Sequence, residues 1–303
     1  MGSKLDGILI QNLSKQYRGT NSPALCDLTL HIQPGEIYGF LGPNGAGKST
    51  TIRLLLNFLR PTSGTATING FDIEKDSVQI RNSLGYLSGD MALYPKLTGK
   101  QYLQFACELQ GLSSEAYKNE LIKKLHPDLD KKMGELSRGN KQKIGIIQAL
   151  MHKPEVIIFD EPTTGLDPLM QEVFFSILKD AKARNATIFV SSHVLGEVQK
   201  MCDRVGIIRQ GKLVGEKNIK ELANEATHTF DLEFADKIPL GALRKIDGLK
   251  IEHASENKVT LHFHGKLKNL LAVLSKYDVI HIDTRSLDLE EEFMHYYSEG
   301  QRS

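Results

Sequence analysis

The stretch GPNGAGKST, residues 42 to 50, constrains the fold of this chain more than any other feature. It fits the pattern G-x-x-x-x-G-K-[ST] and lies between a strand-like run, EIYGFLG, and a helical run, TTIRLLLNFLR, which is the context that a phosphate-binding loop requires. Glycines let backbone N–H groups curl around phosphate oxygens, and the start of the helix adds partial positive charge. The residues expected to surround a bound nucleotide are Gly42, Pro43, Asn44, Gly45, Ala46, Gly47, Lys48, Ser49 and Thr50.

Four side chains in two segments are the candidates for chemistry at this loop. Lys48 is expected to reach the β- and γ-phosphates, and the Ser49 hydroxyl to bind Mg²⁺. The apolar run VIIFDE, residues 156 to 161, carries Asp160 to the end of a strand, where it can hold Mg²⁺ through a water molecule. Glu161 follows as the base or the residue that orients water. Without the phosphate loop, such a strand end would be an ordinary one.

Strands and helices alternate up to about residue 224, and their order predicts an α/β fold. Short, continuously apolar runs such as VIIF and ATIFV are typical of a buried parallel sheet flanked by helices. Residues 90 to about 152 are mostly helical in pattern, with apolar residues three and four apart, so they are expected to form a helical subdomain. In VGIIRQGKLVGE, Gln210 and Gly211 are expected to form a two-residue hairpin turn.

The order of expected strands and helices changes after residue 224, which suggests a second domain over residues 225–303. Its strands and helices are expected in the order β-α-β-β-α-β, which is that of a small α+β, ferredoxin-like sandwich. One of the helices is expected in PLGALRKI, residues 239 to 246. A last amphipathic helix, SLDLEEEFMHYY, would begin with Ser286 as its N-cap. This domain contains no phosphate loop.

Further motifs give the chain a family resemblance. LSRGNKQK, residues 136 to 143, precedes the Asp160–Glu161 strand at a distance typical of a signature sequence. Gly165-Leu166-Asp167 resembles a D-loop, and His193 in VSSHVLGEV resembles a switch histidine. Over residues 8 to about 216 the chain resembles the ATP-binding subunit of an ABC transporter, which implies an ABC-type P-loop ATPase core in which Lys48, Glu161 and His193 are catalytic. The resemblance also implies that Tyr17, in LSKQYRG, stacks on adenine.

The resemblance implies that two such subunits enclose two ATP molecules, each held by the P-loop of one chain and the signature of the other. Ser137, Arg138, Gly139 and Asn140 would then face the partner's ATP, because a helix start with a free hydroxyl is a suitable anion site. Arg138 replaces the more usual glycine and Asn140 replaces glutamine. Arg138 either attracts the γ-phosphate or faces solvent.

The segment after the strand LGYL departs from the family pattern. Gly89 occupies the position where the family usually has a glutamine that reaches Mg²⁺. Either water replaces that ligand, or Asp90 contacts the metal through water; a solvent-facing aspartate is the alternative. Met91, Leu93 and Tyr94 could form an apolar seat for a helix of a membrane subunit, or pack within the chain.

Composition restricts the partners. With 38 Lys and Arg against 37 Asp and Glu, the net charge is +1, which gives no general attraction to nucleic acid. No apolar run reaches the roughly 18 residues of a membrane span, no signal peptide is evident, and the three cysteines are scattered. We therefore expect a peripheral protein on the cytoplasmic face of the membrane, using ATP and Mg²⁺, with an integral membrane permease and a second ATPase subunit as partners.

Within the family, the C-terminal segments resemble those of ATPases of ABC-2-type bacterial exporters of drugs, peptides or polysaccharides. The alternative is a soluble ABC ATPase that acts on nucleic acid or ribosomes. Its typical features, a long inserted coiled coil or two nucleotide domains, are missing from this sequence.

Overall fold

The computed structural model describes residues 6–89, 94–112, 114–219 and 228–286. The chain divides into two compact units, residues 1–218 and 219–303. The boundary expected from the sequence, between residues 224 and 225, lies outside the described residues, as does the helix expected after Ser286. We describe each unit by itself.

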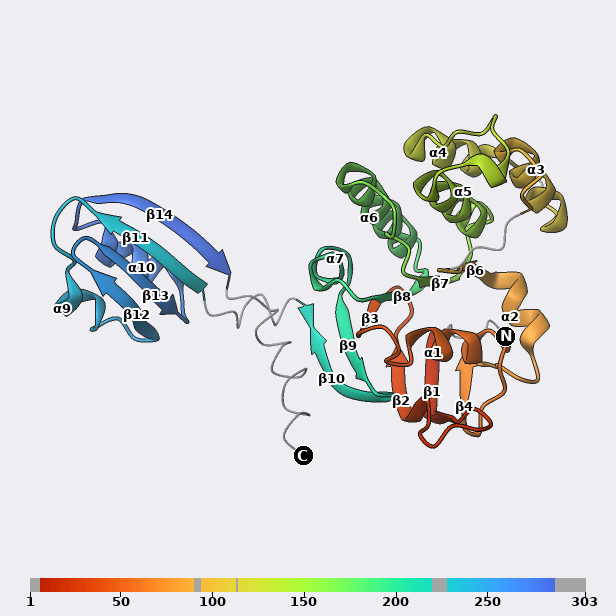
Figure 1. Ribbon diagram of the computed structural model, residues 1–303, viewed down its shortest axis with the longest axis horizontal. Coiled ribbons are helices and arrows are strands. Elements are labelled where there is room, and N and C mark those ends of the chain that lie inside the picture. Colours follow the sequence, from red (N-terminus) through yellow and green to blue (C-terminus); the bar gives the residue numbers. More distant parts are fainter. Residues whose placement is uncertain (1–5, 90–93, 113, 220–227, 287–303) are drawn as a thin grey trace. The chain divides into compact units, whose positions relative to one another are not determined.

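A six-stranded sheet forms the centre of the first unit (Figure 1). Its strand order is β10-β9-β3-β8-β7-β6, in which all neighbours are parallel except β10 and β9. The strands are β3 (Ile37–Leu41), β6 (Leu84–Leu87), β7 (Val156–Asp160), β8 (Thr187–Ser192), β9 (Arg204–Arg209) and β10 (Lys212–Asn218). Every residue of β3, β7 and β8 is buried, as expected for parallel strands covered on both faces.

The turn between β9 and β10 confirms the predicted hairpin. Arg209 pairs with Lys212, so Gln210 and Gly211 are the two turn residues. Their φ angles are 46° and 76°, and two positive values in succession are the mark of a type I′ turn.

A second, antiparallel sheet packs against the first through a helix and was not anticipated from the sequence. Its order is β2-β1-β4-β5, with strands β1 (Ile8–Lys15), β2 (Leu25–Ile32), β4 (Ser63–Ile68) and β5 (Phe71–Asp72). Helix α1 (Lys48–Leu55) shares one apolar core with both sheets. Ile52 and Leu54 of α1 are fully buried among Ile8 of β1 and Ile158 of β7.

Helices α6 (Pro168–Ala183) and α7 (Leu195–Met201) lie on the face of the central sheet opposite α1 (Figure 1). Phe159 of β7 packs against Phe174 of α6, with ring centroids 5.7 Å apart. Because side chains alternate along a strand, Ile158 faces α1 while Phe159 faces α6. The short helix α2 (Ser77–Ser83) precedes β6.

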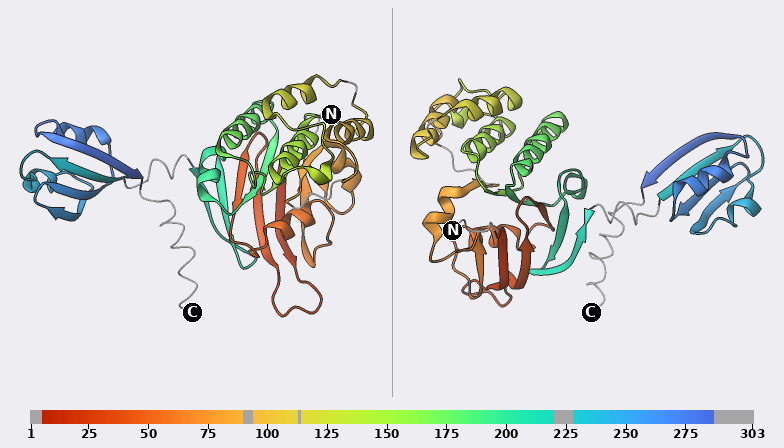
Figure 2. Two further views of the ribbon diagram at one scale, coloured as in Figure 1. Left: turned by 45° about the horizontal axis from the view of Figure 1, so that its top comes forward. Right: turned by 180° about the vertical axis from the view of Figure 1, so that it is seen from behind.

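Three further helices group together at one end of the first unit (Figures 1 and 2). They are α3 (Gly99–Leu109), α4 (Ala116–Leu125) and α5 (Arg138–Leu150), with a 3₁₀ turn at Met133–Glu135. Thr98 starts α3 through a capping box with Gln101, which satisfies backbone groups at the helix start. These helices lie within the span in which the sequence predicts a helical subdomain.

The second unit contains one four-stranded antiparallel sheet of order β12-β13-β11-β14. In chain order its elements are β11 (His228–Phe234), α9 (Leu240–Leu243), β12 (Leu249–Ser255), β13 (Lys258–Phe263), α10 (Leu267–Leu274) and β14 (Val279–Ser286). The prediction of a helix over residues 239–246 is wrong in length. Gly241 in its middle is a poor helix former, and Pro239 has a non-helical ψ of 59°.

Candidate active site

The predicted phosphate loop connects β3 to the start of α1. Gly45 and Gly47 adopt φ angles of 80° and 113°, which side-chain-bearing residues rarely take, so the sharp turn depends on glycine. Lys48, only 5% exposed, curls back over this loop. Its Nζ donates to the carbonyl oxygens of Gly42 at 2.6 Å and Pro43 at 3.2 Å. The loop thus surrounds an ammonium group at the head of a helix.

The three residues predicted to be catalytic form one line of contacts. Glu161 Oε1 lies 3.4 Å from Lys48 Nζ, and Glu161 Oε2 lies 3.1 Å from His193 Nδ1. Glu161 has a φ of 50°, which is uncommon outside glycine and recurs at functional sites. Its N–H donates to the Ser191 carbonyl oxygen and lies equally close to that residue's hydroxyl. The left-handed turn therefore fixes the carboxylate between the lysine and the histidine.

Strand order explains this convergence. β8 lies between β3 and β7, and the three strands are parallel. Leu41 pairs with Ser192 and Asp160 pairs with Ser191, so the loops that follow these strands leave the same edge of the sheet. Ligands of open α/β sheets bind at that edge.

Asp160 and Ser49 are the oxygen ligands that the sequence assigns to a metal. Asp160 is 8% exposed, and its Oδ1 accepts a hydrogen bond from Ser191 Oγ at 2.5 Å. A Cβ atom added to Gly89 would lie 3.4 Å from the Asp160 carbonyl oxygen and 3.8 Å from its carboxylate, so Gly89 borders this group without filling the space. Asp90 lies outside the described residues.

A carboxylate and a hydroxyl are hard oxygen donors, which suit Mg²⁺. Among the described residues no three His, Cys, Asp or Glu side chains gather in a metal-binding group. A metal at Ser49 and Asp160 would therefore need phosphate oxygens and water to complete its shell. The donor set fits a metal that arrives with a nucleotide.

Tyr17 lies beside the phosphate loop. Its hydroxyl is 3.4 Å from Thr50 Oγ1, and the Lys15 ammonium lies 5.8 Å from its ring centroid. An aromatic ring at this place can stack on a base whose phosphates occupy the loop.

The signature residues start helix α5, which is grouped with α3 and α4 (Figure 1). Ser137 is the N-cap, and its hydroxyl oxygen accepts from the backbone N–H of Asn140 at 3.3 Å. The side chain of Asn140 lies 3.3 Å from the same hydroxyl and accepts from the backbone N–H of Asp128 at 3.0 Å. Asn140 thus ties the helix start to the preceding loop.

The start of α5 packs on the D-loop of its own chain. A Cβ atom added to Gly139 would lie only 2.5 Å from the Gly165 carbonyl oxygen. One added to Gly165 would lie 3.2 Å from Cγ of Arg138, so the stem of this exposed arginine runs along the loop. Glycine at position 139 is therefore required by packing in addition to any phosphate contact.

Asp167 is the N-cap of α6 and accepts from the backbone N–H of Met170 at 3.0 Å. Leu169, in the first turn of α6, is 77% exposed.

Of the predicted apolar seat for a membrane subunit, Met91 and Leu93 lie outside the described residues. Tyr94 is 57% exposed and packs edge-on against Phe105 of α3 with ring centroids 5.5 Å apart, so it makes contacts within the chain while part of it remains accessible.

Sequence reasoning missed three polar residues near the site. Ser191 supports Asp160, Gln142 of α5 donates to the Pro162 carbonyl oxygen, and Glu197 of α7 accepts from Thr163. The available signal was a polar residue beside an apolar pattern: Ser191 in ATIFVSSH, and Gln142 two residues before a run of buried isoleucines.

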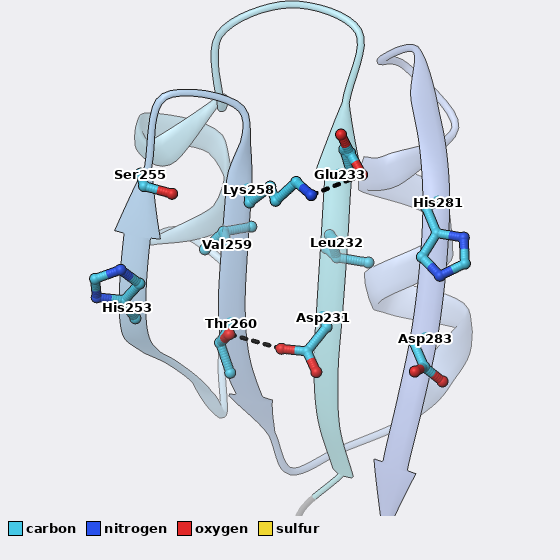
Figure 3. A pocket seen from close by; sticks show the side chains of 10 residues that line it. All are labelled: Asp231, Leu232, Glu233, His253, Ser255, Lys258, Val259, Thr260, His281 and Asp283. Carbon is cyan, nitrogen blue, oxygen red and sulfur yellow. Dashed lines mark hydrogen bonds and ion pairs between the residues drawn. The ribbon is translucent and has the colours of Figure 1, made fainter.

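The open face of the C-terminal sheet has a hollow of about 370 Å³ (Figure 3). Asp231, Glu233 and Asp283 line it from β11 and β14, and Lys258 pairs with Glu233 at 3.3 Å. His253 and His281 also line the hollow, which has neither a glycine-rich loop nor a helix start among its lining residues and so lacks the backbone N–H groups that hold phosphates in the first unit. Nucleotide chemistry belongs to the first unit.

A helix-capping glycine loop with a buried lysine, next to a strand that ends in two carboxylates, defines the class of P-loop nucleoside triphosphatases. Comparisons narrow the class. The sequence profile described as ABC transporter matches residues 25–164. The bacitracin transport ATP-binding protein BcrA of Bacillus licheniformis is 35% identical over 292 residues, covering 93% of this chain and 94% of that protein. The ABC transporter ATP-binding protein NatA of Bacillus subtilis is 35% identical over 225 residues, covering 72% and 92%.

Solved structures agree. The ATP-binding subunit of an ABC transporter has a TM-score of 0.65 and 30% identity, over 71% of this chain and 91% of that one. A dimeric bacterial ABC transporter cassette, 23% identical, shares the fold with a TM-score of 0.64 over 70% and 98%. This chain belongs to the family of ABC transporter ATP-binding proteins. The predicted family, its ABC-type α/β fold and its activity as an ATPase subunit are thereby confirmed, and the soluble alternative is not favoured.

Proposed function

We propose that two such subunits enclose two ATP molecules, each between the P-loop of one chain and Ser137 of the other. The observation that supports this proposal is that Lys48, Glu161 and His193 form one line of contacts beside the P-loop. The start of α5 packs on Gly165 and leaves the Ser137 hydroxyl exposed. The start of α5, with its exposed hydroxyl and backbone N–H groups, is suited to bind the phosphates of the ATP held by the partner's P-loop.

The roles we assign follow from the contacts. Lys48 exchanges its carbonyl partners for the β- and γ-phosphates, which releases Glu161 to accept a proton from the attacking water. His193 holds the Glu161 carboxylate in place, and Tyr17 stacks on adenine. Mg²⁺, when bound at Ser49 and Asp160, would neutralise charge on the phosphates.

On the facing subunit, Arg138, Gly139 and Asn140 complete the signature, in which Gly139 offers its backbone N–H and Asn140 fixes the helix start. Asp167 would face the partner across the dimer. Asp90 stays a proposed water-mediated neighbour of the metal.

A mixing experiment tests the shared site. A chain with Ser137→Arg and a chain with Lys48→Ala are each expected to be inactive, but a heterodimer contains one intact site made of the two undamaged halves. Random pairing places one intact site in half of the dimers, so the recovered ATPase rate should exceed that of either variant alone and reach at most about a quarter of the wild-type rate. Each variant incubated with itself is the control. If dimers form in the mixture and no activity returns, the shared-site arrangement is wrong.

We further propose that the subunit drives an integral membrane permease from the cytoplasmic face of the membrane. In the part of the chain that the structure describes, no helix is long and apolar enough to cross a bilayer, so transport needs a separate pathway. The exposed face of Tyr94 is a candidate contact for that partner. Co-purification with a polytopic membrane protein is the expected result, whereas co-sedimentation with ribosomes or nucleic acid would contradict it.

The cargo we propose is a peptide-like or amphiphilic compound moved outward, because a relative that matches over 93% of this chain is named for bacitracin transport.

We also propose a ferredoxin-like sandwich for residues 225–303. Two helices and a sheet of order β12-β13-β11-β14 around a common apolar core support that assignment. Its acidic open face favours a role in regulation or subunit pairing.

A further inference from the structure

Two buried polar contacts hold the segment that directly follows Glu161. Gln142 of α5 is 3% exposed, and its Nε2 donates to the Pro162 carbonyl oxygen at 2.7 Å. Thr163, 4% exposed, donates from its hydroxyl to Glu197 Oε2 at 2.6 Å. Pro162 and Thr163 are therefore held by hydrogen bonds, the first to a side chain of α5 and the second to a side chain of α7.

Helices α5 and α7 each follow a different part of the proposed ATP site, the signature and the switch histidine respectively. Helix α5 begins directly after Ser137, and Gln142 lies five residues further along the same rigid helix. Helix α7 follows His193, and Glu197 also accepts from the hydroxyl of Ser192, the residue before His193, at 3.2 Å. The hydrogen bonds of Gln142 and Glu197 therefore connect the signature helix, the loop after Glu161 and the loop that contains His193 within one chain.

Two longer contacts connect these hydrogen bonds to the D-loop. The side-chain amide of Gln171 on α6 lies 3.4 Å from Glu197 Oε1 and 3.4 Å from the Leu166 carbonyl oxygen. Leu166 precedes Asp167, the N-cap of α6. The segment from Glu161 to Asp167 is thus attached near both of its ends.

Buried polar groups resist separation because a lost hydrogen bond inside the protein is not replaced by water. A shift of α5 caused by a phosphate at Ser137 would therefore pull on the Pro162 carbonyl, next to Glu161. The close packing of Gly139 on Gly165 leaves little room for α5 to move independently of the loop.

We propose that Gln142 and Glu197 are positioning residues that form a clamp on Pro162 and Thr163 and couple nucleotide bound at a chain's signature to the placement of its own Glu161. The clamp makes hydrolysis at one ATP depend on occupancy of the other. This inference rests on the site roles proposed above.

Substitutions that remove the polar atoms but keep the volume test the clamp in the full chain. Gln142→Leu and Glu197→Leu should each lower kcat by about 10- to 100-fold, because a loop released from a buried hydrogen bond worth about 1–3 kcal/mol holds Glu161 in its catalytic position for a smaller fraction of the time. The Kd for ATP should change by less than about twofold, and the Hill coefficient for ATP should fall toward 1. Glu197→Gln, which still accepts from Thr163, should retain most of the wild-type rate.

The matched control is Glu172→Leu. Glu172 of α6 pairs with Lys200 of α7 at 2.8 Å, so it also joins two helices, but both side chains are exposed. Its kcat and Hill coefficient should equal those of the wild type. Melting temperatures of all variants separate loss of folding from loss of coupling, and Gln142→Met replaces Gln142→Leu if the latter does not fold.

Because both residues act on one segment, the double variant should be little slower than the slower single variant. Additive losses, an unchanged Hill coefficient, or equal losses of kcat and ATP affinity would overturn the clamp. The mixing experiment separates the two proposals. The intact site of that heterodimer takes its Glu161 from the Ser137→Arg chain, whose own signature faces the Lys48→Ala loop, so the clamp predicts a recovered rate well below a quarter of the wild-type rate. Recovery of the full quarter would contradict the clamp, whereas no recovery at all would contradict the shared site.

Discussion

Replacing Glu161 by glutamine is expected to lower kcat for ATP hydrolysis by about 10²- to 10⁴-fold, the range that a positioned acid–base group contributes. Glutamine has the same shape and can still accept a hydrogen bond from Lys48 or His193, which now contact the two carboxylate oxygens at 3.4 and 3.1 Å. It cannot take a proton from water. ATP binding should therefore persist while turnover stops.

Two measurements check this expectation. Steady-state phosphate release gives kcat, and size exclusion with ATP should show a dimer that the wild type does not accumulate. Glu172→Gln, at an exposed carboxylate on α6, is the control and should turn over normally. Wild-type turnover by Glu161→Gln would show that another group activates water.

Lys48→Ala is expected to act at the binding step instead, weakening ATP about 10- to 100-fold. Hydrogen bonds to a charged group contribute about 1.5–3 kcal/mol, and about 1.4 kcal/mol corresponds to a tenfold change in Kd. The substitution removes the ammonium group that the P-loop surrounds, which donates to the carbonyl oxygens of Gly42 and Pro43. Glu161 also loses one of its two partners and keeps His193.

Titration with a fluorescent ATP analogue measures the effect. Lys212→Ala, at an exposed lysine of β10, changes the net charge equally and should bind ATP like the wild type. A folded Lys48→Ala protein with unaltered affinity would remove Lys48 from the phosphate site. The contrast with Glu161→Gln, which should bind but not turn over, separates the two roles.

The sequence predicted best what depends on neighbours along the chain. The P-loop is one continuous turn between a strand and a helix, so its nine residues and their context are visible in the order of residues alone. The same holds for the Gln210–Gly211 turn. Asp160 and Glu161 could be found because a buried strand ends there, at the edge where parallel strands present their loops.

Contacts between distant segments could not be predicted in this way. Gln142 meets Pro162 across 20 residues and Thr163 meets Glu197 across 34, and a polar residue within an apolar pattern does not reveal which distant segment it will contact. The strand SGTATI has few large apolar residues, so the antiparallel sheet it joins was missed. The left-handed φ of Glu161 follows from the tertiary structure rather than from any local propensity.

The close approach of Gly139 to Gly165 bears on how degenerate relatives are interpreted. Since any side chain at position 139 would collide with a carbonyl oxygen 2.5 Å away, folding alone preserves this glycine. A subunit whose half of the composite site had decayed would keep it as firmly as an active one. In the site arrangement proposed above, an intact glycine at this position is therefore weak evidence of catalytic competence, and the residues at the positions of Ser137 and Glu161 are the more informative ones.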